Sequence, residues 1–340
     1  TDLDALTAGL NINSFNGRSG RIDLRGIDYN PNSAAETTVT TYWNQAIVDS
    51  NAVFQQMFDI QRVEVLLGPQ GSLAGRTSPA GAINIHTARA NLDEMEGGIR
   101  TTVADNDRVN TQVAGSFVLI PGELAVRIAG VYDESNLDEI KNDVNGNITQ
   151  DQSKASRVSI SWLPTESLSV DLAVQYLERV NDDIFGLEGA PTGIPGLQDP
   201  NGVLRELGAF DRRGAVFGLE NGMEDNTTAK FWNSSLVLEW DLNSHTITSV
   251  TGYHDTESTR GFDNALGNAN PANVARRVAI DDRTDWSQEL RIASNEGDLW
   301  NYMLGAYYEN SDVYFSQENF LIPAAANAPP CGASGGSKLV

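Results

Sequence analysis

The 340-residue chain holds 46 acidic and 23 basic residues, which gives a formal net charge of −23, and 40% of its residues are hydrophobic. This length exceeds that of one ordinary domain, and the hydrophobic fraction is typical of a folded chain and not of a disordered one. The acidic balance argues against a nucleic-acid partner, because nucleic acids bind basic surfaces. The single cysteine, Cys331, cannot form a disulfide within the chain.

No apolar run reaches the length that a membrane-spanning helix needs. A membrane barrel stays possible, because its strands alternate in polarity and give only a weak hydropathy signal. The chain starts at Thr1 without a methionine or a signal peptide, so we expect a processed or truncated product.

Residues 1–92 are predicted to form a small mixed α/β unit. Short strands that alternate polar and apolar residues are expected at 11–13 and 21–26, and a β-rich run follows at 39–48. The spacing of Phe54, Met57 and Phe58 predicts one or two turns of helix over 54–60, with these side chains on one face.

Residues 62–87 end this unit with the sequence RVEVLLGPQGSLAGRTSPAGAINIHT. Its first part alternates apolar and polar residues, breaks at Gly68-Pro69, and returns as a second apolar run at 82–85. This pattern predicts two strands that are joined by a connector rich in glycine and proline.

From Gly97 onward the pattern has a period of two, with one apolar face and one polar or small face, as at 124–130 and 168–176. A soluble sandwich would show the same alternation, but here short and long connections take turns. Short turns are expected at 120–123, 164–167, 241–244 and 295–298, and long segments at 135–152, 181–227 and 262–278. Short turns at one end and long loops at the other are typical of an outer-membrane barrel.

The aromatic residues favour the same interpretation. Trp162, Trp240 and Trp300 each flank a short turn, while Tyr132, Tyr176 and Tyr253 are placed nearer the long segments. Two aromatic belts on either side of an aliphatic band are expected of strands that cross a bilayer. We count about nine strands, an odd number that cannot close a bacterial barrel by itself.

Residues 62–85 resemble the end of the plug domain of TonB-dependent outer-membrane receptors, and 287–294 resemble a recurring strand of their barrels. The resemblance implies a mixed α/β plug domain over 1–92, followed over 93–340 by antiparallel transmembrane β-barrel strands, about nine of a larger plugged barrel of about 22. It also implies a chain that is incomplete at both ends. Two positions depart from the family pattern: Leu67 stands where a basic residue often precedes Gly-Pro, and Ala80 replaces a glycine.

The same resemblance implies two sets of site residues. In the plug core, the backbone passes close to other atoms inside a filled barrel, which favours glycine, and charged side chains are expected to pair with the inner wall. The plug core comprises Arg62, Glu64, Gly68, Pro69, Gln70, Gly71, Gly75, Arg76 and Gly81. Ligand contact is expected at the external tips of the plug and at polar residues that point into the barrel: Phe15, Asn16, Arg18, Tyr29, Asn30, Asn51, Arg127, Asp171, Gln175 and Arg291.

The function that the resemblance implies is active uptake of a scarce ligand, such as a ferric siderophore or a similar metal chelate, across the bacterial outer membrane. The expected partners are the periplasmic energy transducer TonB, outer-membrane lipid and lipopolysaccharide, and the small ligand. No catalytic residue, no metal site of the protein's own and no cofactor are expected. The acidic segment around 133–151 raises the further hypothesis of divalent-ion bridging to lipopolysaccharide.

Other functions fit the residues less well. Gly75-Arg76-Thr77 lacks the glycine and lysine of a phosphate-binding loop, and the GxSxG pattern at 332–336 has no preceding strand. His86, His245 and His254 show no metal-ligand spacing, and 143–147 places its glycine wrongly for a calcium loop. The sequence therefore lacks the acid–base or nucleophilic residues that an extracellular hydrolase would need. A passive or adhesive β-rich protein that recognises glycans remains the alternative, although it does not explain residues 62–85.

Overall fold

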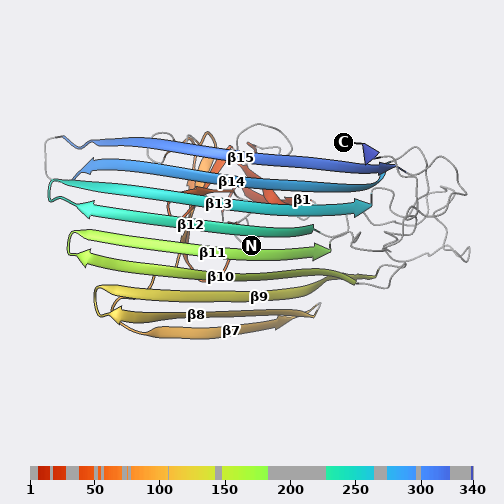
Figure 1. Ribbon diagram of the computed structural model, residues 1–340, viewed down its shortest axis with the longest axis horizontal. Coiled ribbons are helices and arrows are strands. Elements are labelled where there is room, and N and C mark those ends of the chain that lie inside the picture. Colours follow the sequence, from red (N-terminus) through yellow and green to blue (C-terminus); the bar gives the residue numbers. More distant parts are fainter. Residues whose placement is uncertain are drawn as a thin grey trace, which may run out of the picture.

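The computed structural model describes residues 7–15, 18–27, 38–49, 53–54, 57–70, 75, 78–105, 107–141, 148–182, 227–263, 274–295, 300–321 and 338–339. Within them, strands form three sheets, and most of the described residues lie in the largest one (Figure 1). No described helix is long and apolar enough to cross a membrane.

The N-terminal unit contains a hairpin and a four-stranded sheet. In the hairpin, β1 (Leu10–Phe15) pairs with β2 (Arg18–Leu24). The four-stranded sheet has the order β4-β3-β6-β5 and is built from β3 (Val39–Trp43), β4 (Ala46–Val48), β5 (Ile60–Leu67) and β6 (Gly81–Thr87). Its core packs Leu24, Trp43, Ile83 and Ile85, all at most 2% exposed, so the unit has a hydrophobic core of its own.

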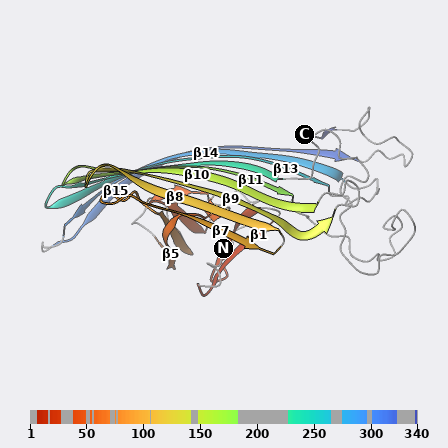
Figure 2. The same cartoon turned by 90° about the horizontal axis from the view of Figure 1, so that it is seen from below.

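The long sheet is antiparallel throughout, and each strand pairs with its neighbours in sequence. Its nine long strands are β7 (Glu96–Ala104), β8 (Arg108–Ile120), β9 (Leu124–Lys141), β10 (Ile148–Thr165), β11 (Leu168–Asp182), β12 (Thr227–Asp241), β13 (His245–Asp263), β14 (Val274–Ser294) and β15 (Met303–Leu321). The two-residue β16 (Lys338–Leu339) pairs with β15 at its end. The N-terminal unit lies on one side of this curved sheet, as Figure 2 shows.

The fold class expected from the sequence is confirmed. The connections alternate only in part as expected, because 105–107 and 142–147 are short connections at the same end as 183–226 and 264–273. Strands β8 and β9 are joined by 121–123, β10 and β11 by 166–167, and β12 and β13 by 242–244, all at one end of the sheet (Figure 1). Residues 183–226 and 264–273 join strands at the other end. Parity of this kind distinguishes a barrel wall from a soluble sandwich.

Two expectations about local structure were wrong. Helical conformation is present at Val53 and Phe54, but Met57 and Phe58 are irregular and Ile60 already begins β5, so the expected helix does not run to 60. The supposed long segment 135–152 is mostly strand, because β9 and β10 extend through it and leave 142–147 as the connection. Polar residues there extend the strands beyond the apolar band, which an amphipathic pattern cannot reveal.

Candidate functional site

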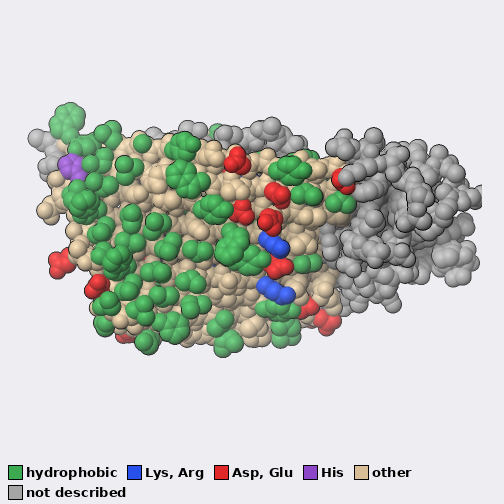
Figure 3. All heavy atoms as spheres, viewed as in Figure 1, with side chains coloured by type: hydrophobic (Ala, Val, Ile, Leu, Met, Phe, Trp, Pro, Cys, Tyr) green, Lys and Arg blue, Asp and Glu red, His purple; other side chains and the backbone are tan. Residues whose placement is uncertain are grey.

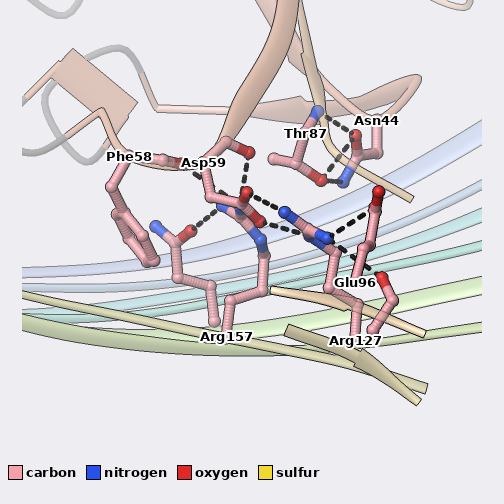
Figure 4. Close-up of polar contacts among 9 residues, drawn as sticks. Asn44, Phe58, Asp59, Thr87, Glu96, Arg127 and Arg157 are labelled. Atoms are coloured by element: carbon pink, nitrogen blue, oxygen red, sulfur yellow. Dashed lines mark hydrogen bonds and ion pairs between the residues drawn. The ribbon is translucent and has the colours of Figure 1, made fainter. Parts of the chain in front are cut away.

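The N-terminal unit is fastened to the long sheet at Asp59, which lies just before β5. Its carboxylate Oδ1 is 2.6 Å from Arg127 Nη2, and its Oδ2 is 2.9 Å from Arg127 Nε and 3.0 Å from Arg157 Nη2 (Figure 4). Arg127 lies on β9 and Arg157 on the adjacent β10, so one carboxylate bridges two strands of the long sheet. We call Asp59, Arg127 and Arg157 the anchor.

Arg157 is the most enclosed member of the anchor, with 1% of its side chain exposed. Its guanidinium donates to the backbone oxygens of Phe58 and Asp59 at 3.1 and 2.7 Å and to Gln175 Oε1 at 3.0 Å, and it stacks on the Phe58 ring at 4.7 Å. A buried charge needs such partners, and removing one member of a buried pair costs about 3–5 kcal/mol. The anchor therefore fixes this part of the N-terminal unit to the sheet.

The charge state of the anchor follows from its surroundings. Burial raises the pKa of the Asp59 carboxyl, but hydrogen bonds from Arg127 and the positive charges of Arg157 and Arg127 outweigh it, so the pKa lies below its ordinary value. Asp59 is thus ionised at neutral pH. It also has a φ of 49°, an uncommon conformation for a residue with a side chain, which the surrounding contacts hold in place.

Other contacts between the two parts are polar and scattered. Arg89 Nη1 lies 3.1 Å from Asp171 Oδ2, and Arg291 Nη2 donates to Gln45 Oε1 at 2.7 Å. Ser235 donates to the backbone oxygen of Asn44 at 2.7 Å. A cavity between the two parts is lined by both polar and apolar side chains, among them Asn44, Asp171, Leu172 and Val237. The interface therefore combines these polar contacts with two apolar clusters, one around Phe58 and one around Ala46.

The four lumen-facing residues expected to contact ligand all lie at this interface. Arg127 binds Asp59, Asp171 binds Arg89, Arg291 binds Gln45, and Gln175 supports Arg157. Their inward orientation is as expected, but in this structure their contacts hold the N-terminal unit.

Two expected plug-core glycines pass very close to other atoms. A Cβ at Gly75 would lie 2.6 Å from the Tyr307 ring of β15, and a Cβ at Gly81 would lie 2.3 Å from the backbone oxygen of Leu66. Both also have positive φ, 46° and 152°. The backbone therefore passes too close to its neighbours at Gly75 and Gly81 for a side chain to fit, as the resemblance implied for the plug core.

The remaining plug-core residues are placed differently. Arg62 and Glu64 are half-exposed on β5 and form an ion pair with each other at 2.7 Å. The described ion pairs to the long sheet are made by Asp49, Asp59 and Arg89 instead. Gly68 and Pro69 end β5, and Gln70 exchanges two backbone hydrogen bonds of 2.8 Å with Ser78, which closes the connector. Gly71 and Arg76 lie outside the described residues.

The external ligand candidates are only partly within the described chain. Phe15 and Arg18 pair across the end of the β1–β2 hairpin. Asn16, Tyr29, Asn30 and Asn51 lie outside the described residues. Among described side chains, no group of three or more His, Cys, Asp or Glu could hold a metal ion.

Comparisons with known proteins agree with this architecture. The family described as "TonB-dependent Receptor Plug Domain" matches residues 1–82. The pesticin receptor of Yersinia pestis is 34% identical over 117 residues, which cover 32% of this chain and 16% of that protein. The catecholate siderophore receptor Fiu of Escherichia coli K12 is 23% identical over 314 residues, covering 89% of this chain and 36% of Fiu.

Solved structures share the fold. The ferric yersiniabactin uptake receptor FyuA of Y. pestis superposes with a TM-score of 0.73 at 18% identity, over 94% of this chain and 46% of that one. The receptor FpvA of P. aeruginosa superposes with a TM-score of 0.64 at 12% identity, over 94% of this chain and 40% of that one. The chain thus spans less than half the length of these relatives.

Proposed function

The chain belongs to the TonB-dependent receptors of the bacterial outer membrane, and from this premise we propose that it serves the active uptake of a ferric chelate, such as a ferric siderophore. The N-terminal unit is the plug, and the long sheet is part of the barrel wall. We place the domain boundary at 92/93, in the connection between β6 and β7.

The observation that carries this proposal is the set of ion pairs and single hydrogen bonds that join the plug to the wall beside its apolar contacts. A large apolar interface would bind the plug as firmly as a protein core, whereas ion pairs and single hydrogen bonds can be exchanged for water. The anchor concentrates much of the attachment at one carboxylate. A plug of this kind can stay closed at rest and can be released when TonB pulls on it from the periplasm.

The ligand is proposed to bind on the external side, at Phe15, Asn16, Arg18, Tyr29, Asn30 and Asn51. The β1 hairpin lies toward the end of the sheet that carries the connections 183–226 and 264–273 (Figure 1). In outer-membrane barrels the long connections are extracellular. Aromatic, amide and guanidinium groups are the types of side chain that can recognise an anionic or aromatic chelate.

The names of the relatives support the class of ligand. They are a pesticin receptor, a catecholate siderophore receptor and a ferric yersiniabactin uptake receptor. All are receptors, so we propose transport without bond chemistry. Outer-membrane lipid and lipopolysaccharide surround the wall as its remaining partners.

Uptake of radioactive iron tests the proposal. Cells that lack their own receptors would express the receptor containing this chain and be offered ferric catecholate, ferric yersiniabactin or ferric pyoverdine, with and without TonB. We expect at least one chelate to accumulate only in cells with TonB. Accumulation that does not depend on TonB, or none with any chelate, would overturn the proposal.

A further inference from the structure

Some arginines of the wall bind the plug and a carboxylate of the wall at the same time. Over most of its area the outward face of the wall shows few charged side chains (Figure 3), while these arginines lie on the inner face with the plug. The described contacts join four wall arginines to the plug: Arg127 on β9, Arg157 on β10, and Arg283 and Arg291 on β14. Three of them also have a carboxylate partner on the wall, in the pairs Arg127–Glu96, Arg283–Asp285 and Arg291–Glu289.

Arg127 uses separate nitrogens for the plug and for the wall. Its Nε and Nη2 donate to the Asp59 carboxylate of the plug at 2.9 and 2.6 Å. Its Nη1 donates to Glu96 Oε1 at 3.2 Å and to Ser116 Oγ at 2.9 Å (Figure 4). Glu96 pairs in register with Ser116, and Ser116 with Arg127, so the three form one row across β7, β8 and β9. The wall contacts of Arg127 therefore do not depend on the plug.

The two arginines of β14 divide their nitrogens in the same way. In each, Nε faces a carboxylate two residues away on β14, and a terminal nitrogen faces the plug. The distances are 2.6 Å from Arg283 Nε to Asp285 and 3.7 Å from its Nη1 to Asp49, and 3.4 Å from Arg291 Nε to Glu289 and 2.7 Å from its Nη2 to Gln45. Residues two apart on a strand lie on the same face of the sheet, so β14 itself brings each arginine and its wall carboxylate together.

A second carboxylate matters because the plug takes its own polar groups with it when it leaves. A charge inside a protein that loses its only counter-ion is strongly destabilised. A guanidinium has five N–H donors in a fixed fork, so it can serve two partners and keep one of them. Arg157 is the exception among the four, since its partner among the described wall residues is the neutral amide of Gln175.

We propose that Glu96, Asp285 and Glu289 are positioning residues of the uptake cycle, which keep the arginines of the wall paired and in place while the plug is displaced. This inference rests on the proposed function, because it requires that the plug leave the wall. The plug then leaves without exposing three unpaired cations, and it returns to guanidinium groups that have not moved. Arg157, which keeps no wall carboxylate among the described residues, supplies the positive charge that attracts Asp59 back.

Labelling of a cysteine at the interface between plug and wall tests this role. Ser235 Oγ donates to the backbone oxygen of Asn44 of the plug at 2.7 Å, and Ser235 is 1% exposed. Ser235→Cys, in a Cys331→Ala background, should therefore react with a maleimide only when the plug is displaced. The purified receptor that contains this chain would be labelled in urea too dilute to unfold the wall, and the rate of labelling would be measured.

Loss of the wall carboxylates should slow the labelling. The docked plug then meets no competing carboxylate at the arginine, and the arginine has no counter-ion once the plug has left. We expect labelling to be slower by about threefold or more with Glu96→Gln, and slower still when Asp285→Asn and Glu289→Gln are added. The Glu96 side chain is 53% exposed, so Glu96→Gln should fold normally and decides the test if the triple variant does not fold. A merely structural role of these carboxylates would loosen the plug and give faster labelling.

Asp151→Asn is the matched control. Asp151 forms the same kind of wall pair with Arg179, at 2.6 Å, but Arg179 has no described contact with the plug, so the rate should not change. Asp59→Asn should speed labelling by a larger factor in the Glu96→Gln background than in the wild type, because Arg127 then has one carboxylate to lose. Faster labelling with Glu96→Gln, or a rate equal to that of the control, would overturn the proposal. The assay uses neither TonB nor a ferric chelate, so its failure is separate from a failure of uptake.

Discussion

Arg157 and Asp59 are 98 residues apart in the chain, yet the Arg157 guanidinium donates to both the carboxylate and the backbone oxygen of Asp59, at 3.0 and 2.7 Å. The second contact does not depend on the side chain of Asp59. Arg157 thus binds the plug both through the backbone oxygen of Asp59 and through its carboxylate charge.

Asp59→Ala should weaken the attachment of the plug, because it leaves the buried Arg157 without its counter-ion. We expect a loss of about 3–5 kcal/mol in the free energy of unfolding, measured by urea denaturation of the purified receptor. Glu64→Gln is the matched control, since Glu64 pairs with Arg62 at the surface and should change stability by less than about 1 kcal/mol. Equal effects of the two changes would contradict the role of the anchor.

The contribution of Asp59 to stability should fall in acid. Its pKa is lower in the folded protein than in the unfolded chain, so its stabilisation is complete above the unfolded pKa of about 3.9 and is lost as the pH falls through the lower folded value. The measurement is the difference in unfolding free energy between the wild type and Asp59→Asn from neutral pH downward. The stability advantage of the wild type over Asp59→Asn should shrink as the pH falls, and an advantage that grows instead would contradict the lowered pKa of Asp59.

Gly75→Ala should destabilise the plug more than Gly68→Ala. Both glycines have positive φ, but a Cβ at Gly75 meets the Tyr307 ring, whereas a Cβ at Gly68 meets nothing within 4 Å. Part of the Gly75→Ala loss should be recovered when Tyr307→Ala is added, because the two residues are in contact. Unfolding free energies of the single and double variants measure this coupling. Strictly additive losses would show that the close approach has no energetic effect.

Phe15→Ala combined with Arg18→Ala should lower the affinity for the transported chelate without lowering stability, since both residues lie at the end of the β1–β2 hairpin. Binding of the radioactive chelate to whole cells without TonB measures affinity apart from transport. Arg62→Ala is the control, because it changes the same charge on the surface of the same unit. An unchanged affinity in the double variant would remove these residues from the ligand site.

Much of the fold could be predicted from local patterns. Alternation identified the outward and inward faces of β9 and β11, and the glycines at 75 and 81 were expected to mark close passage of the backbone, as the structure shows. The extent of the strands could not be predicted. Tyr132 and Tyr253 lie near the middle of β9 and β13, because polar residues continue these strands past the apolar band.

The pairing of Asp59 with Arg157 in the anchor could not be predicted from the sequence, for a physical reason. Asp59 fell inside a segment whose spacing suggested a helix, and helical periodicity carries no information about a positive φ. Arg157 did leave a signal, since it is the large residue among Ser153, Ala155, Ser159 and Ser161 on the inward face of β10. A lone arginine among small inward residues indicates a buried charge, but its partner, 98 residues away, can be found only in the folded chain.

The central claim is that the plug must leave the wall for uptake, and a reversible crosslink tests it most directly. A Cβ at Gly252 of β13 would lie 3.0 Å from the Cβ of Ala46 in the plug, so Ala46→Cys with Gly252→Cys can form a disulfide in a Cys331→Ala background, with Ser287→Ala to make room. The account predicts that TonB-dependent uptake of the ferric chelate stops when the disulfide forms and returns on reduction. Undiminished uptake with the disulfide fully formed would contradict it.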